Sequence, residues 1–224
     1  MNMSIESVKV FNQMAEDYDR WFDSHSAVFQ SELDALKKII PESGEGLDVG
    51  VGSGRFAAAL GIKTGIDPSI KLGNMARSRG IHVDEGVGEA LPFQDQQFDF
   101  VLLNTVLCYL DLPLAALLEA KRVLKPNGKL IIGMIDKNSM LGRQYEATKQ
   151  DNPFYRHAHF YSVNEVLELL HEINFKEEDF YQTLFLPIEA ILTPDVIKPG
   201  YGEGGYVVLS ARIELNRFSY RDFI

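Results

Sequence analysis

The chain has little cysteine and no long apolar run. Its one cysteine, Cys108, cannot form an intramolecular disulfide or a cysteine metal cluster, and no metal site is expected. No stretch approaches the roughly 20 apolar residues that a membrane helix needs. The opening MNMSIESVKV lacks the continuous apolar core of a signal peptide. We therefore expect a cytoplasmic protein without a membrane partner.

Positive charge is scarce relative to negative charge. Lys and Arg number 22 whereas Asp and Glu number 32, which gives a formal net charge of −10. Phosphate backbones and anionic lipids attract surfaces of positive potential, and no run of Lys and Arg is present to build one. The composition disfavours a nucleic-acid partner and indicates no particular oligomeric state.

Apolar periodicity divides the chain into a helical start and an alternating remainder. Residues 5–40 carry apolar side chains every three or four positions, which predicts helix up to Pro41. Beyond it, short apolar runs alternate with helical stretches, a pattern typical of βαβ units and a parallel sheet. The predicted strands are 46–50, 62–66, 81–84, 98–104, 129–135, 175–186 and 206–213, and the predicted helices 55–60, 69–79, 113–124 and 162–172.

Two helices carry N-terminal capping signals. Ser69 is the expected cap of helix 69–79, and Ser162 with Glu165 has the spacing of a capping box. Residues 136–159 are expected to form a loop. The Pro- and Gly-rich stretch 187–205 suits a lid over a substrate pocket, a dimer contact or a long connection, and the sequence does not distinguish among these.

The stretch LDVGVGSG at residues 47–54 combines a strand, a glycine-rich turn and a helix start. Open α/β sheets bind ligands at such turns, because glycines let the backbone pass close beneath a ligand. The alternative is a tight turn that only needs left-handed backbone angles. Arg55 stands where G-x-G-x-x-G would place its third glycine, which disfavours a nicotinamide dinucleotide.

Asp67 stands at the end of the second predicted strand. A carboxylate there can accept hydrogen bonds from both hydroxyls of a ribose. The alternative is a capping role ahead of Pro68 and the following helix.

Further motifs follow in a fixed order. GIDPS spans 65–69, GVGEALPF spans 86–93, FDFV begins at Phe98 and LKPNGKLIIG spans 124–133. Together with LDVGVGSG they resemble the class I S-adenosylmethionine-dependent methyltransferases. The resemblance implies a Rossmann-like, doubly wound, seven-stranded and mostly parallel sheet, with helices on both faces and an antiparallel last strand. It implies one domain over 1–224: a helical cap (1–40), a cofactor-binding core (45–135) and a substrate-side half (136–224).

The resemblance also assigns cofactor contacts. Their roles are contact with the methionine part (Gly50, Val51, Gly52), ribose binding (Asp67), the surroundings of the adenine (Pro68, Ser69, Gly88, Glu89), a backbone facing the methionine ammonium (Asn104) and closure over the methionine part (Tyr18). Tyr18 is equally well explained as a core aromatic of an amphipathic helix. The family often has an acid at the position of Val87, and valine cannot accept a hydrogen bond from the adenine amino group.

The expected activity is methyl transfer from S-adenosyl-L-methionine to a small-molecule acceptor, in the EC 2.1.1 class. The cofactor carries the reactive group, so the protein chiefly aligns the reactants and excludes water. The candidates for acceptor chemistry are Tyr109 and His159, the latter being a possible base or a solvated loop residue. The alternatives are a non-catalytic methyltransferase-like binding or regulatory protein and a nicotinamide-dependent oxidoreductase.

Overall fold

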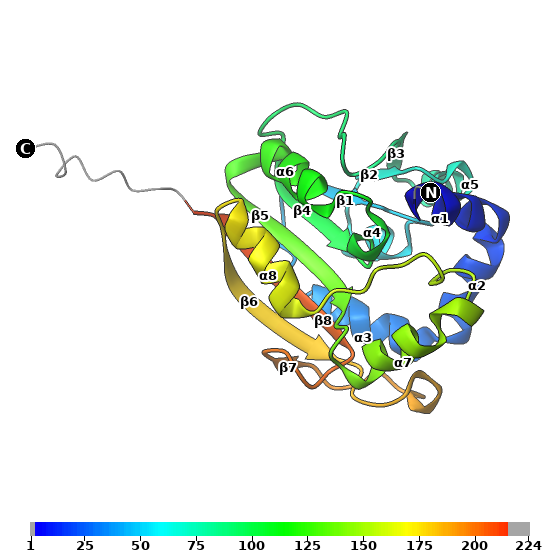
Figure 1. Cartoon of the computed structure of the whole chain (residues 1–224). Coiled ribbons are helices and arrows are strands. Elements are labelled where there is room, and N and C mark those ends of the chain that lie inside the picture. Colours follow the sequence, from blue (N-terminus) through cyan, green and yellow to red (C-terminus); the bar gives the residue numbers. More distant parts are fainter. Residues whose placement is uncertain (1–2, 215–224) are drawn as a thin grey trace, which may run out of the picture.

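One sheet of eight strands runs through the structure, a computed structural model that describes residues 3–214 (Figure 1). The strand order is β3-β2-β1-β4-β5-β8-β6-β7. The strands are β1 (Gly46–Val49), β2 (Thr64–Asp67), β3 (His82–Glu85), β4 (Phe98–Asn104), β5 (Leu124–Ile135), β6 (Phe175–Thr183), β7 (Lys198–Pro199) and β8 (Tyr206–Ile213).

The strand directions confirm the predicted fold class. Strands β1 to β5 pair in parallel, whereas β8 lies antiparallel between β5 and β6. The sheet has one strand more than the expected seven, because Lys198 and Pro199 of the 187–205 stretch pair with the edge of β6. Proline is tolerated there because an edge strand needs no donor on its outer side.

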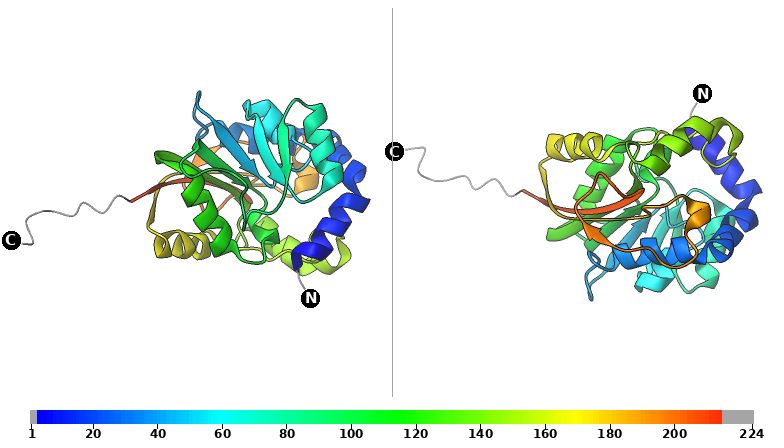
Figure 2. Two further views of the ribbon diagram at one scale, coloured as in Figure 1. Left: turned by 90° about the horizontal axis from the view of Figure 1, so that it is seen from above. Right: turned by 90° about the horizontal axis from the view of Figure 1, so that it is seen from below.

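The helices α1 to α8 lie around the sheet, and helices are found on both of its faces (Figure 2). Their bounds are α1 (Met3–Gln13), α2 (Ala15–Ser24), α3 (Ser26–Leu36), α4 (Arg55–Leu60), α5 (Ile70–Ser78), α6 (Pro113–Val123), α7 (Met140–Thr148) and α8 (Val163–Glu172). Within residues 3–214, no helix has the length and apolarity needed to cross a membrane.

The expected single helix over 5–40 is wrong: the segment forms three helices, with breaks at Met14 and His25. His25 has non-helical backbone angles, with φ −122° and ψ 44°. Its ring Nδ1 lies 3.0 Å from the Trp21 carbonyl, and Ser24 Oγ donates to the Arg20 carbonyl. Side chains that bond to nearby carbonyls compete with the helical backbone, and here they accompany the turn between α2 and α3.

The expected loop at 136–159 is also partly wrong, because it contains α7. Ser139 caps that helix, its Oγ accepting from Gly142 N at 2.9 Å. The predicted caps are confirmed: Ser69 accepts from Leu72 N, and the Ser162–Glu165 pair forms both bonds of a capping box.

The core consists of two apolar layers, one on each face of the sheet. On one face α6 and α8 cover one set of strand residues, including Val101 and Leu103. On the other face α3, α4 and α5 cover the alternate residues, such as Phe100 and Leu102. This alternation follows from the two-residue period of a strand.

Candidate functional site

The turn after β1 is built from glycines in left-handed conformations. Gly50, Gly52 and Gly54 have φ values of 74°, 54° and 81°. A Cβ at Gly50 would collide with the Val106 side chain, so alanine does not fit there. A Cβ at Gly52 would instead enter the space below Tyr18, 3.5 Å from its hydroxyl. The turn therefore brings bare backbone to a cavity wall.

Asp67 ties this turn to the end of β2. Its Oδ2 accepts from Gly52 N and its Oδ1 from Ser69 N, each at 2.8 Å. Burial raises the pKa of Asp67 to about 6, although the two backbone N–H groups act in the opposite direction. Each carboxylate oxygen has a further lone pair, so the group can still accept a bond from a ligand hydroxyl.

A cavity, here called the turn cavity, opens above these residues. It brings together every predicted cofactor-binding residue except Val51 (Tyr18, Gly50, Gly52, Asp67, Pro68, Ser69, Gly88, Glu89 and Asn104). The Val51 side chain is buried in the core, where a Cβ at Gly65 would lie 2.7 Å from it. Ser7, Val8 and Phe11 of α1 complete the wall, and no sequence signal pointed to them.

The segment after β3 forms another side of the turn cavity. Val87 lines it and remains 38% exposed. Gly88 is tightly packed, because a Cβ there would lie 3.0 Å from the Val49 side chain. Glu89 accepts from the backbone N–H of Asp111 at 3.0 Å and so holds the chain ahead of α6.

The side chain of Asn104, at the end of β4, is held in place by contacts with β5 and β8. Tyr206, fully buried on β8, donates its hydroxyl hydrogen to Asn104 Oδ1 at 2.7 Å. Gly133 of β5 lies against both side chains, and a Cβ there would collide with them. The side-chain oxygen is thus committed to the fold, and Asn104 is one of the residues that line the turn cavity.

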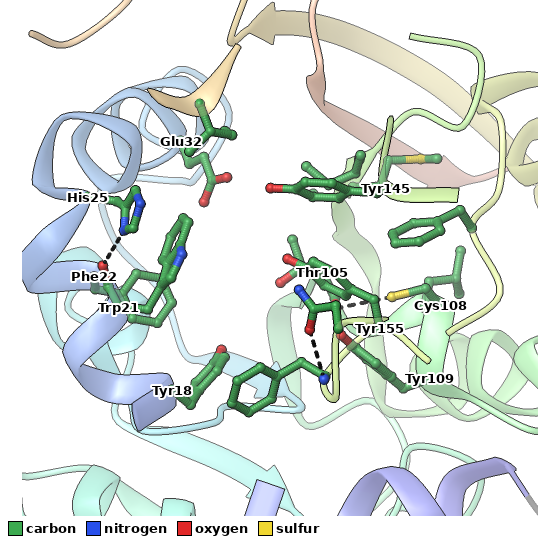
Figure 3. A pocket seen from close by; sticks show the side chains of 18 of the residues that line it. Tyr18, Trp21, Phe22, His25, Glu32, Thr105, Cys108, Tyr109, Tyr145 and Tyr155 are labelled. Carbon is green, nitrogen blue, oxygen red and sulfur yellow. Dashed lines mark hydrogen bonds between the residues drawn. The ribbon is translucent and has the colours of Figure 1, made fainter. Parts of the chain in front are cut away.

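A second cavity of about 300 Å³, here called the aromatic cavity and shown in Figure 3, shares part of its wall with the turn cavity. Aromatic side chains from α2, α7 and the segment after α7 dominate its wall, among them Trp21, Phe22, Tyr145, Phe154 and Tyr155. Both cavities share four lining residues: Phe11, Tyr18, Thr105 and Tyr109. The two spaces therefore meet at Tyr18 and Tyr109.

Glu32 is the unexpected member of the aromatic cavity. It lies on α3, is 7% exposed and points into the cavity opposite Tyr145 (Figure 3). Within residues 3–214 its carboxylate has no hydrogen-bond or ion-pair partner, and burial raises its pKa to about 8. A sequence signal was present: Val28, Glu32 and Leu36 share one helical stripe whose other members are core residues.

The predicted acceptor candidates are placed differently. Tyr109 lines both cavities, and burial raises its pKa well above the ordinary value, so it remains a neutral phenol near pH 7. His159 is exposed, lines neither cavity, and stacks edge-on against Tyr161 with centroids 4.5 Å apart.

Acidic side chains line both cavities without basic Lys or Arg side chains beside them in the described residues. Among the described residues, no Lys or Arg lines either space, whereas Glu32, Glu189, Asp67 and Glu89 do. Asp48 lies buried on β1 near Asp67, its Oδ1 without a partner in the described chain, and burial with the Asp67 charge raises its pKa to about 8. No group of three or more His, Cys, Asp or Glu in residues 3–214 is arranged to hold a metal. Such surroundings favour cationic ligands.

Comparison with known proteins agrees with this geometry. The methyltransferase-domain family profile matches residues 47–132. A crystal structure from Thermotoga maritima, described as a "SAM-dependent methyltransferase, possible histamine N-methyltransferase", superposes with a TM-score of 0.89 at 41% identity, covering 92% of this chain and 99% of that one. The chain belongs to the S-adenosylmethionine-dependent methyltransferases.

Two further relatives differ in how much of the chain they match. An uncharacterized protein of Methanocaldococcus jannaschii is 48% identical over 91% of this chain and 98% of its own length. A demethylmenaquinone methyltransferase of Tropheryma whipplei is 34% identical over 55% of this chain and 56% of its own length. The second similarity spans little more than half of either methyltransferase.

Proposed function

We propose that the protein transfers a methyl group from S-adenosylmethionine, bound in the turn cavity, to a small-molecule acceptor in the aromatic cavity. The observation that carries this proposal is the junction of the two cavities at Phe11, Tyr18, Thr105 and Tyr109. A donor on one side and an acceptor on the other would meet there, shielded by aromatic side chains.

The residues of the turn cavity fit the cofactor. Gly52 leaves space under Tyr18 that a side chain would fill, which suits the methionine part. Asp67 retains lone pairs for ribose hydroxyls. Val87, Gly88 and Pro68 would surround the adenine. The Val87 side chain cannot accept a hydrogen bond from the adenine amino group. Val51 would contribute through its backbone alone, because its side chain is in the core.

Charge separates this proposal from a nicotinamide oxidoreductase. S-adenosylmethionine carries a sulfonium and an ammonium, and both suit a cavity lined by carboxyl groups without Lys or Arg among the described residues. A dinucleotide would bring a diphosphate into the same negative surroundings. Together with Arg55 in place of a third glycine, this favours the methyl donor.

Methyl transfer needs alignment more than acid–base chemistry. When bound, the cofactor would supply an electrophilic methyl group for an acceptor lone pair. Tyr18 and Tyr109 would exclude water from the junction, and both stay neutral because burial raises their pKa. Thr105, held by its N–H to the Gly133 carbonyl at 2.7 Å, would contribute a polar group there.

The acceptor is proposed to be a small molecule. The aromatic cavity has a volume of about 300 Å³, at the lower end of small-ligand sites. Two relatives are described by names that refer to small acceptors, a quinone and an amine. The three-part division into 1–40, 45–135 and 136–224, the cytoplasmic location and the lack of a nucleic-acid partner remain proposals.

The decisive experiment is isothermal titration with S-adenosylhomocysteine, with NADH as a control ligand. We expect a dissociation constant near micromolar, about −8 kcal/mol, and no heat with NADH. Binding of NADH alone would support the oxidoreductase. Binding of neither, repeated with S-adenosylmethionine, would leave a non-catalytic role for the fold.

A matched pair of glycine variants locates the cofactor. Gly52 and Gly61 both have positive φ, 54° and 76°, but a Cβ at Gly61 meets nothing within 4 Å. Gly52→Leu and Gly61→Leu should each lose about 1–2 kcal/mol of stability from left-handed strain. Only Gly52→Leu should weaken S-adenosylhomocysteine binding, by roughly 100-fold or about 3 kcal/mol. Equal binding by both variants would contradict the assigned site.

A further inference from the structure

Glu32 is a buried acid that the methyl-transfer mechanism does not use. It lies on the apolar stripe of α3, is 7% exposed and faces the aromatic cavity rather than the turn cavity. Asp19 and Glu119 are paired with arginines, whereas Glu32 and Asp48 are buried without a cation among the described residues, and of these two only Glu32 lines a cavity. An isolated carboxyl group is costly to bury, so the absence of a partner within residues 3–214 needs a reason.

The wall around Glu32 is suited to a cation. Trp21, Phe22, Tyr145 and Tyr155 present ring surfaces to the same space, and aromatic faces attract ammonium groups. No Lys or Arg among the described residues lines the cavity to compete for the carboxylate. An anionic ligand would meet no Lys or Arg among the described residues of this wall.

The position of Glu32 also constrains the acceptor. In Figure 3, Glu32 and Tyr145 lie at one end of the cavity, whereas Tyr18 and Tyr109 lie at the other. Tyr18 and Tyr109 border the turn cavity and Glu32 does not. A group held by Glu32 is therefore remote from the entering methyl group.

We propose that the acceptor carries an ammonium group, which Glu32 binds at the far end of the aromatic cavity, and a separate nucleophilic atom that reaches Tyr18 and Tyr109. This inference rests on the proposed function, since it assigns the acceptor class for the same site. Glu32 acts as a specificity residue: it neutralises the cation while the aromatic rings enclose it.

Proton uptake and release provide a signature of this pairing. Burial raises the pKa of Glu32 to about 8, so in the empty cavity the carboxyl is mostly protonated at pH 7. A bound ammonium stabilises the carboxylate, and binding should release nearly one proton to the buffer. The other titratable groups that line this space are Tyr18, His25, Cys108, Tyr109, Tyr145, Tyr155, Tyr161 and Glu189.

The test uses 2-phenylethylamine and its neutral analogue 2-phenylethanol, titrated into protein saturated with S-adenosylhomocysteine. The wild type should prefer the amine. Glu32→Gln keeps the shape but removes the charge, and should weaken amine binding by about 10- to 100-fold while leaving the alcohol unchanged. Asp34→Asn is the matched control: Asp34 lies on the same helix, lines neither cavity and pairs with Lys37 at the surface, so amine binding should change little.

The proton count gives a readout that needs no variant. Titrations of the wild type in buffers of different ionisation enthalpy should reveal proton release with the amine and none with the alcohol. Equal affinity of the wild type for amine and alcohol, or unchanged amine binding by Glu32→Gln, would overturn the inference. S-adenosylhomocysteine affinity, measured separately, tells a failed cofactor assignment from a failed acceptor assignment, and normal affinity in Glu32→Gln shows that the variant is folded.

Discussion

The helical cap over the site is held to the core by one ion-pair cluster around Asp19. This residue follows Tyr18 on α2. Arg55 donates to it through Nε at 2.8 Å, and Arg79 through Nη2 at 2.9 Å. Arg55 begins α4 directly after the glycine turn, and Arg79 also donates to the Ser53 carbonyl. The cluster therefore joins the helix that carries Tyr18 to the turn that Tyr18 faces.

Asp19→Asn should cost about 2 kcal/mol. Exposed ion pairs contribute at most about 1 kcal/mol, whereas removing one member of a fully buried pair costs about 3–5 kcal/mol. The Asp19 side chain, 16% exposed, lies between these limits. Neither guanidinium is left alone, because Arg55 keeps Asp23 and Arg79 keeps the Ser53 carbonyl.

The assay exploits the single tryptophan of the chain. Trp21 lies on α2, stacked on His25 with centroids 4.3 Å apart, so its fluorescence reports on the cap. Circular dichroism reports on all helices and strands. In Asp19→Asn the urea midpoint by fluorescence should fall by about 0.5–1 M. The midpoint by circular dichroism should fall less, because the sheet keeps its core.

The control is Asp17→Asn, which removes an exposed partner of Arg20 on the same helix. It should cost under about 0.5 kcal/mol. Equal effects of the two substitutions would refute a holding role for Asp19. A fall of both spectroscopic midpoints by the same amount would instead show that cap and sheet unfold together.

The pH dependence of this effect follows from the same contacts. Although burial acts to raise the pKa of Asp19, its bonds to Arg55, Ser53 and Arg79 hold that pKa well below its usual value. A depressed pKa stabilises the fold at pH values above the unfolded pKa, about 4. The stability difference between wild type and Asp19→Asn should therefore be constant near neutral pH and shrink as the pH falls below about 4.

Two smaller predictions concern fixed polar contacts. Tyr206→Phe leaves Asn104 Oδ1 buried without its donor and should cost about 1–2 kcal/mol by urea unfolding; Tyr201→Phe, whose hydroxyl is on an exposed residue, should have little effect. Ser162→Ala removes the capping box of α8 and should cost about 1 kcal/mol. A cost near zero would mean that the Glu165 carboxylate alone satisfies that helix end.

Local signals predicted the part of the site that local sequence builds. The glycine turn, Asp67 at a strand end and Asn104 at the next strand end all follow from short motifs. Parallel strands bring their carboxyl ends to one edge, so these residues had to converge. The caps Ser69 and Ser162 were likewise predictable, because a cap depends on residues within one turn.

The aromatic cavity was beyond such signals, because its walls come from distant segments. Trp21, Glu32, Tyr145 and Tyr155 belong to elements whose meeting depends on the breaks at Met14 and His25. The apolar periodicity continues through both breaks, so a single helix was predicted. The arrangement of the three helices that form the cap was therefore not predicted. Glu32 alone offered a clue, as a carboxylate on an otherwise apolar stripe.

The buried carboxyl groups that line the two cavities follow a common electrostatic logic. In the aromatic cavity Glu32 has no bonded cation among the described residues, and burial raises its pKa to about 8; in the turn cavity Asp67 accepts only backbone N–H groups, and burial raises its pKa to about 6. Each group is therefore close to the balance between its neutral and charged forms at neutral pH. A cationic ligand tips that balance, whereas a neutral one does not. Ligand charge would thus decide occupancy on both sides of the Tyr18–Tyr109 junction, and a protein of net charge −10 would draw such ligands toward it.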